Sequence, residues 1–461
     1  MRIRKDVGGL TLGDEAAART GSWDPVLDVY ARGVQAMKDL DRPGRRPKPK
    51  SWKWAANTHG IDAATSPRPA WGQCQHQALF FLPWHRAYLA WFEGTIRELT
   101  GEDDWALPYW DYSDPASARR LPVEFTVSTR TVDGQVVANP LFAQNRSPDP
   151  IPAADVDLRP ALSQPNFVLP MEYGFGGVVP DQYPGVAEQL PHNYIHVDIG
   201  GNAGEMRSPA TAGRDPIFWL HHSNIDRIWE MWRALDGSIE LTDSTAATGA
   251  LKSQWRSASF TFGDERRPAT YSMDDVEDLT TPRMDYRYES IELPGGIAAE
   301  VVTERERVLA AQGGGLGLDE AIPAWTPVAA TFDVASGEER DLQLEGGLGL
   351  DGAPPTRLML ELAGTTATDP HDAYVVEVRI APGAEPHVVG RFSTFGLAGT
   401  PDDEVRNYLV DATSALPALL DEGWSGAELV VKVVPEGGRA DSEDESKAIL
   451  INQVTIYTQT S

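Results

Sequence analysis

Cysteine, basic charge and long apolar runs are all scarce in this sequence. A single cysteine in 461 residues, Cys74, excludes an internal disulfide framework. Lysine and arginine number 40 against 68 aspartate and glutamate, and the net charge of −28 makes nucleic acids and anionic membranes poor partners. No apolar run approaches the roughly 18 residues that span a bilayer. No apolar segment follows the basic start, so we expect a cytoplasmic protein or one exported without a visible signal.

Length and composition predict two domains, because 461 residues exceed one ordinary core. Twelve of the fourteen tryptophans and seven of the nine histidines precede residue 290. Within this first part, residues 84–99 carry apolar side chains at helical spacing. A second helix is indicated up to about Leu235, with Asp215 as N-cap and Pro216 at the first helical position. Residues 120–190 are rich in proline and glycine, which predicts long packed loops.

The second part of the chain has a different pattern. A loose stretch follows residue 300 and includes a glycine-rich segment at 313–319. Beyond it, runs rich in β-forming residues alternate with turn residues, at 358–362, 374–380, 387–393, 429–434 and 449–457. The fold class predicted is therefore multidomain α+β. A mainly α-helical bundle at residues 1–290 is followed by a linker at 291–324 and an antiparallel β-sandwich at 325–461.

Seven histidines of the first part form two groups with metal-ligand spacing: His59, His76 and His85, then His192, His196, His221 and His222. Imidazole is the commonest protein ligand for a transition metal, and an all-imidazole set suits copper, zinc, iron or nickel rather than calcium or magnesium. His192 and His196 are four residues apart, which places both on one helix face. Adjacent helical residues point about 100° apart, so only one of His221 and His222 can join them, and spacing does not choose between the two.

The residues around these histidines resemble the two copper motifs of the type 3 copper family, which includes tyrosinases, catechol oxidases, polyphenol oxidases and mollusc haemocyanins. The first motif lies at 74–86 and contains Cys-Gln-His and Phe-Leu-Pro-Trp-His-Arg; the second lies at 191–196 and 215–229. The resemblance covers roughly residues 1–290. It implies that two copper ions are bound, one by His59, His76 and His85 and the other by His192, His196 and His222, with His221 as a neighbour.

The resemblance also implies roles for residues beside the ligands. Phe218 would pack over the binuclear site, and Cys74 would be joined to His76 by a covalent thioether bond. Glu188 and Asn193 would together hold a water that takes the proton from an incoming phenol, because a carboxylate and an amide oxygen can polarise one water as a general base. Residues 389–397 resemble part of the β-sandwich that covers the copper site in some relatives, which predicts a lid over the site here.

The function implied is copper-dependent oxidation of phenols and o-diphenols to o-quinones by dioxygen. The partners expected are a small phenolic substrate and dioxygen, and the oligomeric state stays open. One alternative is a haemocyanin-like oxygen carrier. Another is a zinc-dependent hydrolase, although such sites normally include carboxylate ligands and a general base, which neither motif supplies. His371 and His387 are isolated, and we expect surface or packing roles for them.

Overall fold

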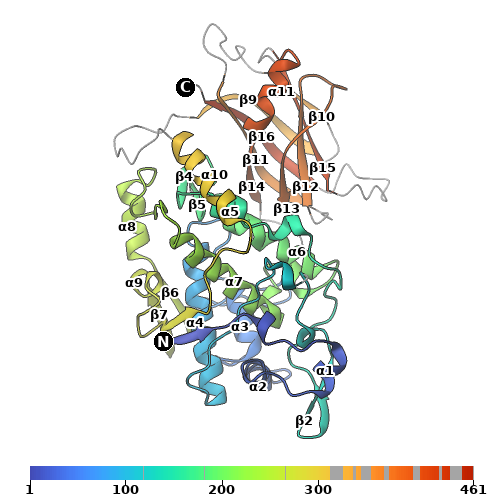
Figure 1. Ribbon diagram of the computed structural model, residues 1–461, viewed down its shortest axis with the longest axis vertical. Helices are drawn as coiled ribbons and strands as arrows, with labels where there is room; N and C mark the ends of the chain where they lie inside the picture. Colours follow the sequence, from blue (N-terminus) through green and yellow to red (C-terminus); the bar gives the residue numbers. More distant parts are fainter. Residues whose placement is uncertain are drawn as a thin grey trace.

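The computed structural model describes residues 1–117, 119–180, 182–264, 266–311, 325–335, 339–343, 355–367, 373–397, 405–424, 428–436 and 449–459. The fold is mixed α+β. Helices dominate up to residue 311, and β-strands dominate from residue 325 onward, a part that we call the C-terminal β-region. Figure 1 shows these two parts stacked along the longest axis of the molecule, with the C-terminus at the far end of the β-region.

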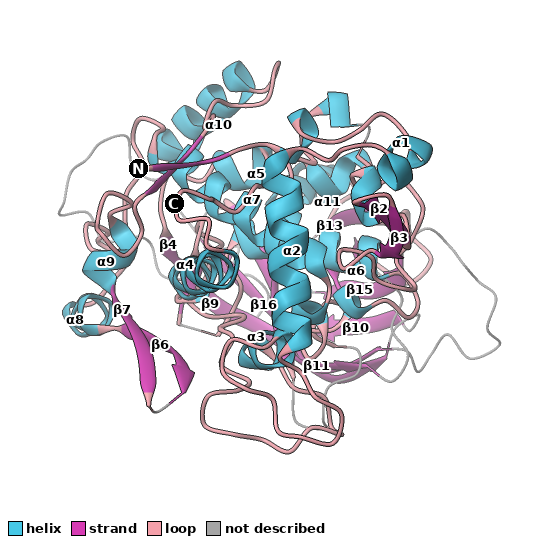
Figure 2. Ribbon diagram, turned by 90° about the horizontal axis from the view of Figure 1, so that it is seen from below, coloured by secondary structure: helices cyan, strands magenta, loops and turns pink. Residues whose placement is uncertain are grey.

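Two long helices, α4 (Phe81–Thr100) and α7 (Pro216–Arg233), pack against each other at the centre of the helical part. Helix α2 (Pro25–Asp39) packs across α4, and α3 (Trp52–His59) lies near the end of α2 (Figure 2). The α2–α4 approach requires a glycine, because a Cβ on Gly33 would lie 2.6 Å from a methyl carbon of Ile96. This close packing holds the helices that carry the histidines.

Helix α7 begins as its sequence predicts. The Asp215 side chain accepts a hydrogen bond from the Ile217 backbone N–H, and Pro216 occupies the first turn. The helix ends at Arg233, two residues before the predicted end. From Pro216 to Trp232, every residue except Glu230 is buried, so α7 is a central helix without a solvent face.

Shorter elements complete the helical part. The helices are α1 (Glu15–Thr20), α5 (Arg159–Leu162), α6 (Tyr194–Gly200), α8 (Gly249–Ser257), α9 (Met273–Glu277) and α10 (Ala298–Ala311), and a π-helical turn, η5 (Glu188–Asn193), leads into α6. The strands are β1 (Arg2–Arg4), β2 (Thr129–Val132), β3 (Gln135–Ala138), β4 (Val168–Pro170), β5 (Gly177–Val179), β6 (Ser259–Asp264), β7 (Arg267–Ser272) and β8 (Tyr286–Tyr288). Residues 120–190 contain only short elements between loops, as predicted.

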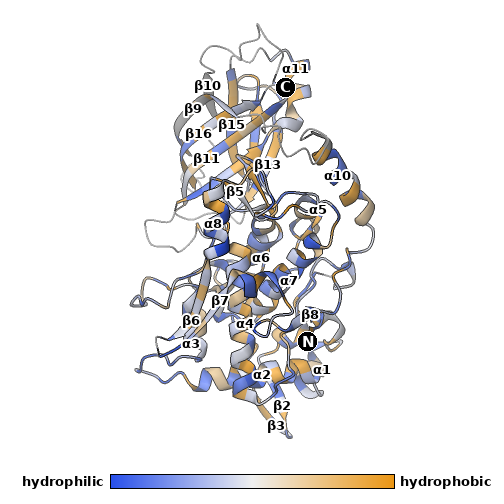
Figure 3. Cartoon of the chain, turned by 90° about the vertical axis from the view of Figure 1, so that its left-hand side faces the viewer, coloured by the Kyte–Doolittle hydropathy of each residue, from blue (hydrophilic) through white to orange (hydrophobic). Residues whose placement is uncertain are grey.

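The C-terminal β-region contains two four-stranded antiparallel sheets, ordered β10-β15-β12-β13 and β14-β11-β16-β9. Their strands are β9 (Thr326–Ala335), β10 (Glu339–Gln343), β11 (Arg357–Ala367), β12 (Ala373–Arg379), β13 (His387–Ser393), β14 (Arg406–Asp411), β15 (Glu428–Pro435) and β16 (Ile449–Gln459), with one helix, α11 (Leu416–Asp421). Apolar side chains of both sheets form one buried cluster. In Figure 3 the ribbon of these strands includes many orange, hydrophobic segments. All five predicted β-runs are strands.

The sequence predicts a loose stretch after residue 300, but the first part of that stretch is helical in the structure. Helix α10 occupies it, with Val301 buried in the helical core and Arg305 donating to the carbonyls of Leu162 and Gln164. The glycine-rich segment at 313–319 and His371 lie outside the described residues. Across the described ranges, no helix combines the length and apolar character that a bilayer crossing requires.

Candidate metal centre

Three elements bring the first group of histidines together. His59 is the last residue of α3, His85 lies in the first turns of α4, and His76 lies in the segment that joins these helices. One ring nitrogen from each lies within 4.8 Å of the others. The same criterion groups His192, His196, His221 and His222, which come from η5, α6 and α7. The structure therefore unites all seven histidines selected from the sequence.

Backbone carbonyl groups fix the orientation of several rings. The Nδ1 atoms of His59, His85 and His196 lie 2.8 Å from the carbonyl oxygens of Pro209, Phe81 and Met206, respectively. A carbonyl can only accept, so Nδ1 carries the proton and the lone pair is on Nε2. This arrangement is typical of metal-binding histidines, whose second nitrogen binds a hydrogen-bond partner in the surrounding shell.

The Nε2 atoms on the opposite sides of the rings lack partners among the described residues. They belong to His59, His76, His85, His192 and His221, and all five are buried. A buried polar atom without a hydrogen bond costs about 1–3 kcal/mol, and five such atoms within the two histidine groups require an explanation. Metal ions bound within the two groups supply one, and an all-imidazole donor set suits copper.

Burial also favours the neutral ring that a metal needs. Desolvation lowers the pKa of His59 to about 4 and that of His192 to about 3. The same cause places the pKa values of the other five clustered histidines well below the usual value. All seven rings are thus neutral near pH 7 and can bind a metal without first losing a proton.

His221 and His222, which helical spacing left equivalent, have different neighbours, although a ring nitrogen of each lies within 4.8 Å of His192 and His196. The Nε2 atoms of His222 and His196 lie 3.4 Å apart, close enough to share one metal ion. The His222 ring also stacks on His85 of the first group, with ring centres 4.3 Å apart. His221 stacks instead on His192 and contacts Tyr112. His222 therefore lies between the two histidine groups.

Phe218 and Cys74 both lie against the histidines. The Phe218 ring is 4.8 Å from His59 and 4.3 Å from His222, so it contacts one ring of each group. The Cys74 sulfur lies 3.3 Å from Nδ1 of His76. A thioether between the sulfur and the imidazole ring requires this proximity, and the bond itself stays a prediction.

Glu188 and Asn193 are both buried and both have partners that the sequence did not indicate. An oxygen of the Glu188 carboxylate accepts from the backbone N–H of Gln77, at 2.7 Å. The Asn193 side-chain oxygen lies 2.9 Å from Nδ1 of His192, so it orients that ring. Gln77 directly follows His76. Glu188 and Asn193 are therefore each connected to one histidine group.

Phe395 is a site residue that sequence reasoning did not identify. It follows β13 in the C-terminal β-region, and its ring stacks on His196 with centres 4.0 Å apart. Its edge-on contacts with His76 and His192 are 5.6 and 5.5 Å long. The one signal in the sequence is its place inside the segment 389–397. A single apolar side chain of the β-region thus covers both histidine groups.

Polar contacts hold the β-region in this position. The Tyr173 hydroxyl accepts from the Leu409 backbone at 2.6 Å, and Arg357 forms a 2.6 Å ion pair with Glu172. The Gln77 amide donates to the carbonyl oxygen of Asn407, at 3.3 Å. A cavity of about 1000 Å³ lies beside these contacts, between α5, α10 and the β-region, and none of the seven histidines lines it. The cavity is therefore separate from the metal centre.

Comparisons with known proteins agree with this geometry. The model of the common central domain of tyrosinase matches residues 49–172 and 172–235. The tyrosinase HcTyr1 of Hahella sp. (strain CCB-MM4) is 28% identical, over 95% of this chain and 97% of its own length. The latent polyphenol oxidase of Prunus armeniaca is 28% identical over 58% of this chain, which spans only 46% of that enzyme. The solved structure of latent apple tyrosinase superimposes with a TM-score of 0.58 at 20% identity and covers 100% of this chain and 97% of its own; at this identity it shows the fold alone.

Proposed function

The chain belongs to the type 3 copper family, and we propose that it oxidises phenols and o-diphenols to o-quinones with dioxygen. The observation that carries this proposal is the set of buried Nε2 atoms that face one another without hydrogen-bond partners. Two bound copper ions would supply the reduction of dioxygen and the withdrawal of electrons from the phenol. The protein itself would supply ligands, orientation and exclusion of water.

Six histidines are proposed as ligands, three for each copper ion: His59, His76 and His85, and His192, His196 and His222. The Nε2 contact between His196 and His222 supports the choice of His222 over His221. Phe218 would form an apolar wall against which the rings stay in place, since it touches a ring of each group. The Cys74–His76 thioether would remove the rotational freedom of that ring.

Glu188 and Asn193 are proposed to hold the water that accepts the phenol proton. Each already orients a part of the site, Glu188 through the Gln77 backbone and Asn193 through His192. A carboxylate and an amide oxygen on the two sides of the site can bind one water between them. Deprotonation of a monophenol would precede its hydroxylation, whereas a diphenol would depend less on this water.

We further propose a helical bundle at residues 1–290, a linker at 291–324 whose helix α10 packs on the bundle, and a β-sandwich at 325–461 that acts as a lid. The separate apolar clusters of the two parts support this division. The Phe395 ring supports the lid, because it occupies the space above His196 where a phenol ring would approach the metal ions. The full chain would then be a latent form whose β-region must move before a substrate can bind.

Metal analysis and turnover test the function together. The purified chain should contain two copper ions, and it should oxidise catechol after limited proteolysis within residues 300–320 while its copper content stays constant. A zinc-containing protein without oxidase activity would contradict the proposal. Reversible binding of dioxygen without turnover, by both the full and the cleaved chain, would favour the oxygen carrier. An uncleaved chain as active as the cleaved one would exclude the lid but retain the oxidase.

A further inference from the structure

A buried carboxylate, that of Asp226, joins the two helices that carry histidines from opposite groups. Asp226 lies one turn after His222 on α7, and Arg86 directly follows His85 on α4. Nε of Arg86 donates to one oxygen of Asp226 across the contact between these helices. Both side chains are almost fully buried. The ion pair therefore links the two histidines indirectly: Arg86 is next to His85 on α4, and Asp226 is one turn from His222 on α7.

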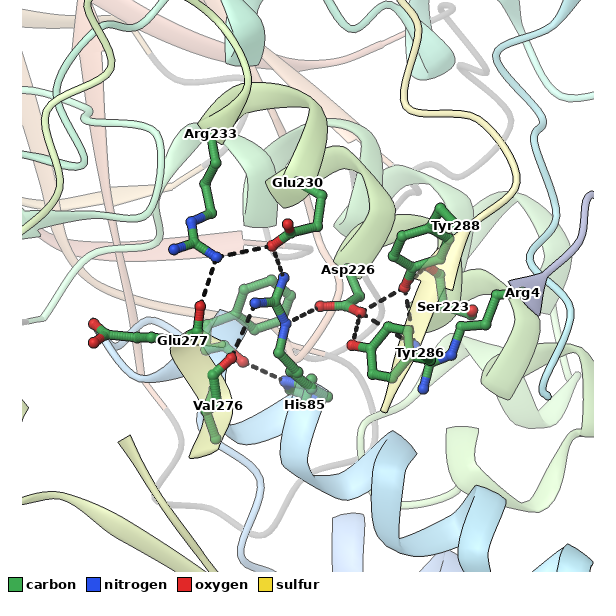
Figure 4. Close-up of polar contacts among 12 residues, drawn as sticks. Arg4, His85, Ser223, Asp226, Glu230, Arg233, Val276, Glu277, Tyr286 and Tyr288 are labelled. Atoms are coloured by element: carbon green, nitrogen blue, oxygen red, sulfur yellow. Dashed lines mark hydrogen bonds and ion pairs between the residues drawn. The ribbon is translucent and has the colours of Figure 1, made fainter. Parts of the chain in front are cut away.

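Three further groups donate to the second oxygen of the same carboxylate. They are the Arg4 guanidinium, at 3.1 Å, and the hydroxyl groups of Tyr286 and Tyr288 (Figure 4). These residues belong to the paired strands β1 and β8, which are the first and one of the last segments of the helical part. One carboxylate thus accepts four hydrogen bonds from α4, β1 and β8.

Arg4 repeats the link between the helices, and Tyr288 adds a second contact with α7. Arg4 also forms a 3.0 Å ion pair with Glu93 of α4, so its guanidinium contacts both helices. The Tyr288 hydroxyl lies 2.9 Å from the carbonyl oxygen of Ser223, the residue after His222. One route besides the Arg86–Asp226 pair therefore fixes α7 relative to α4: it runs through Arg4, whose guanidinium also donates to the Tyr288 hydroxyl at 2.9 Å.

Stability alone is a poor reason for such a network. Buried ion pairs are often replaced by apolar residues without loss of stability, because desolvation offsets the attraction. Their directional hydrogen bonds do, however, fix distances in a way that apolar contacts do not. We infer that Asp226, together with Arg86 and Arg4, is a positioning residue that sets the separation of His85 and His222 and hence of the two copper ions. This inference rests on the proposed binuclear copper site.

The substitution Asp226→Asn tests the inference, because it keeps the shape of the side chain and removes its charge. Asp215→Asn is the matched control. Asp215 is also buried, and it is the N-cap residue of the same helix, α7. It pairs with Arg146 of a preceding loop, among the described residues no hydrogen bond or ion pair joins its side chain to α4, and asparagine can still cap the helix. Copper content, thermal midpoint and the electron paramagnetic resonance (EPR) spectrum of the oxidised protein would be measured for both variants.

Two closely spaced Cu(II) ions with a shared bridging ligand couple their spins and give no EPR signal, whereas separated ions do. We expect Asp226→Asn to retain copper and to show a Cu(II) signal from more than half of it. Asp215→Asn should stay silent, with a comparable decrease in thermal midpoint. Silent copper in both variants at equal stability would overturn the inference and leave the proposed function intact. Wild-type protein without a coupled pair would overturn both.

A second pair of variants covers the case in which Asp226→Asn does not fold. Tyr286→Phe and Tyr288→Phe each remove one donor to Asp226 and keep the ring. Because Tyr288 also contacts the carbonyl oxygen of Ser223, its variant should give the larger EPR signal. If both stay silent, and the double variant does too, the network does not set the metal separation.

Discussion

The helical part and the C-terminal β-region differ in what they bury. The helical part encloses seven histidines and the ion pairs around Asp226, Arg86 and Glu93. In the described part of the β-region, Arg406 is the one buried charged side chain, and the core consists of apolar residues. The helical part must hold the ring nitrogens of its histidines within reach of a metal, whereas the β-region needs only to present one apolar ring, that of Phe395, to the metal centre.

This difference indicates that metal binding and substrate access depend on separate sets of residues. The histidines of the helical part are oriented by carbonyl groups of the same part, such as those of Pro209, Phe81 and Met206. None of these contacts involves the β-region, although Ser393 of β13 reaches the Asn193 carbonyl oxygen. Changes in the helical part should therefore alter copper binding, and changes near Phe395 should alter access.

The largest effect that we predict comes from His222→Ala. Loss of this ligand should lower the copper content from two ions per chain to about one and reduce catechol oxidation at least about 1000-fold, because the reaction needs both ions. Copper analysis and oxygen consumption would measure it.

His221→Ala is the matched control, since it removes the neighbouring ring on the same helix. It should retain both copper ions and lose no more than about 10–100-fold in activity, as is typical of residues around a ligand. If His221→Ala loses copper and His222→Ala does not, the assignment of the two residues must be exchanged.

The helical part was the more predictable of the two. Helices α4 and α7 follow from apolar spacing and from the Asp215-Pro216 start, and the histidines follow from ligand spacing. Resemblance, rather than geometry, selected His222. The Gln77–Glu188 and Asn193–His192 contacts were not predictable, because they depend on how loops close around the centre.

The β-region was predicted only in part. The strands that sequence patterning missed are β9, β10 and β14, and each lies at an edge of its sheet. An edge strand lacks a paired neighbour on one side and needs less apolar alternation than a central one; β10, for example, reads Glu-Arg-Asp-Leu-Gln. This reason does not apply to β14, whose Tyr408, Leu409 and Val410 are buried. Phe395 could not be named because its position follows from the docking of the two parts, which no local pattern encodes.

Glu188→Gln should separate the two reactions that the centre is proposed to perform. We expect monophenol hydroxylation to fall about 100-fold, since general-base assistance typically contributes about 100- to 10,000-fold, and diphenol oxidation to fall less than about threefold. Initial rates with tyrosine and with catechol would be compared at equal copper content. Equal losses on both substrates would indicate that Glu188 only supports the Gln77 backbone.

Phe395→Ala should raise the activity of the uncleaved chain. Removal of the ring opens the space above His196, and we expect catechol oxidation to increase about tenfold at constant copper content. The control is Phe392→Ala, because Phe392 is buried within the β-region. It should lower the stability of that region by about 3–5 kcal/mol. An activity increase in Phe392→Ala alone would mean that general loosening, and not the Phe395 ring, controls access.

The smallest predicted effect concerns acid and the metal-free protein. Burial lowers the pKa of His59 to about 4, so between pH 6.5 and 4 the unfolded state binds a proton that the folded state does not. The free energy of unfolding should be constant above pH 6.5 and fall as the pH decreases, by about 1.4 kcal/mol per pH unit for this residue. Denaturant unfolding followed by tryptophan fluorescence reports mainly the helical part, which contains twelve of the fourteen tryptophans. His59→Gln should weaken this pH dependence, and an unchanged slope in that variant would show that the acid sensitivity arises from other groups.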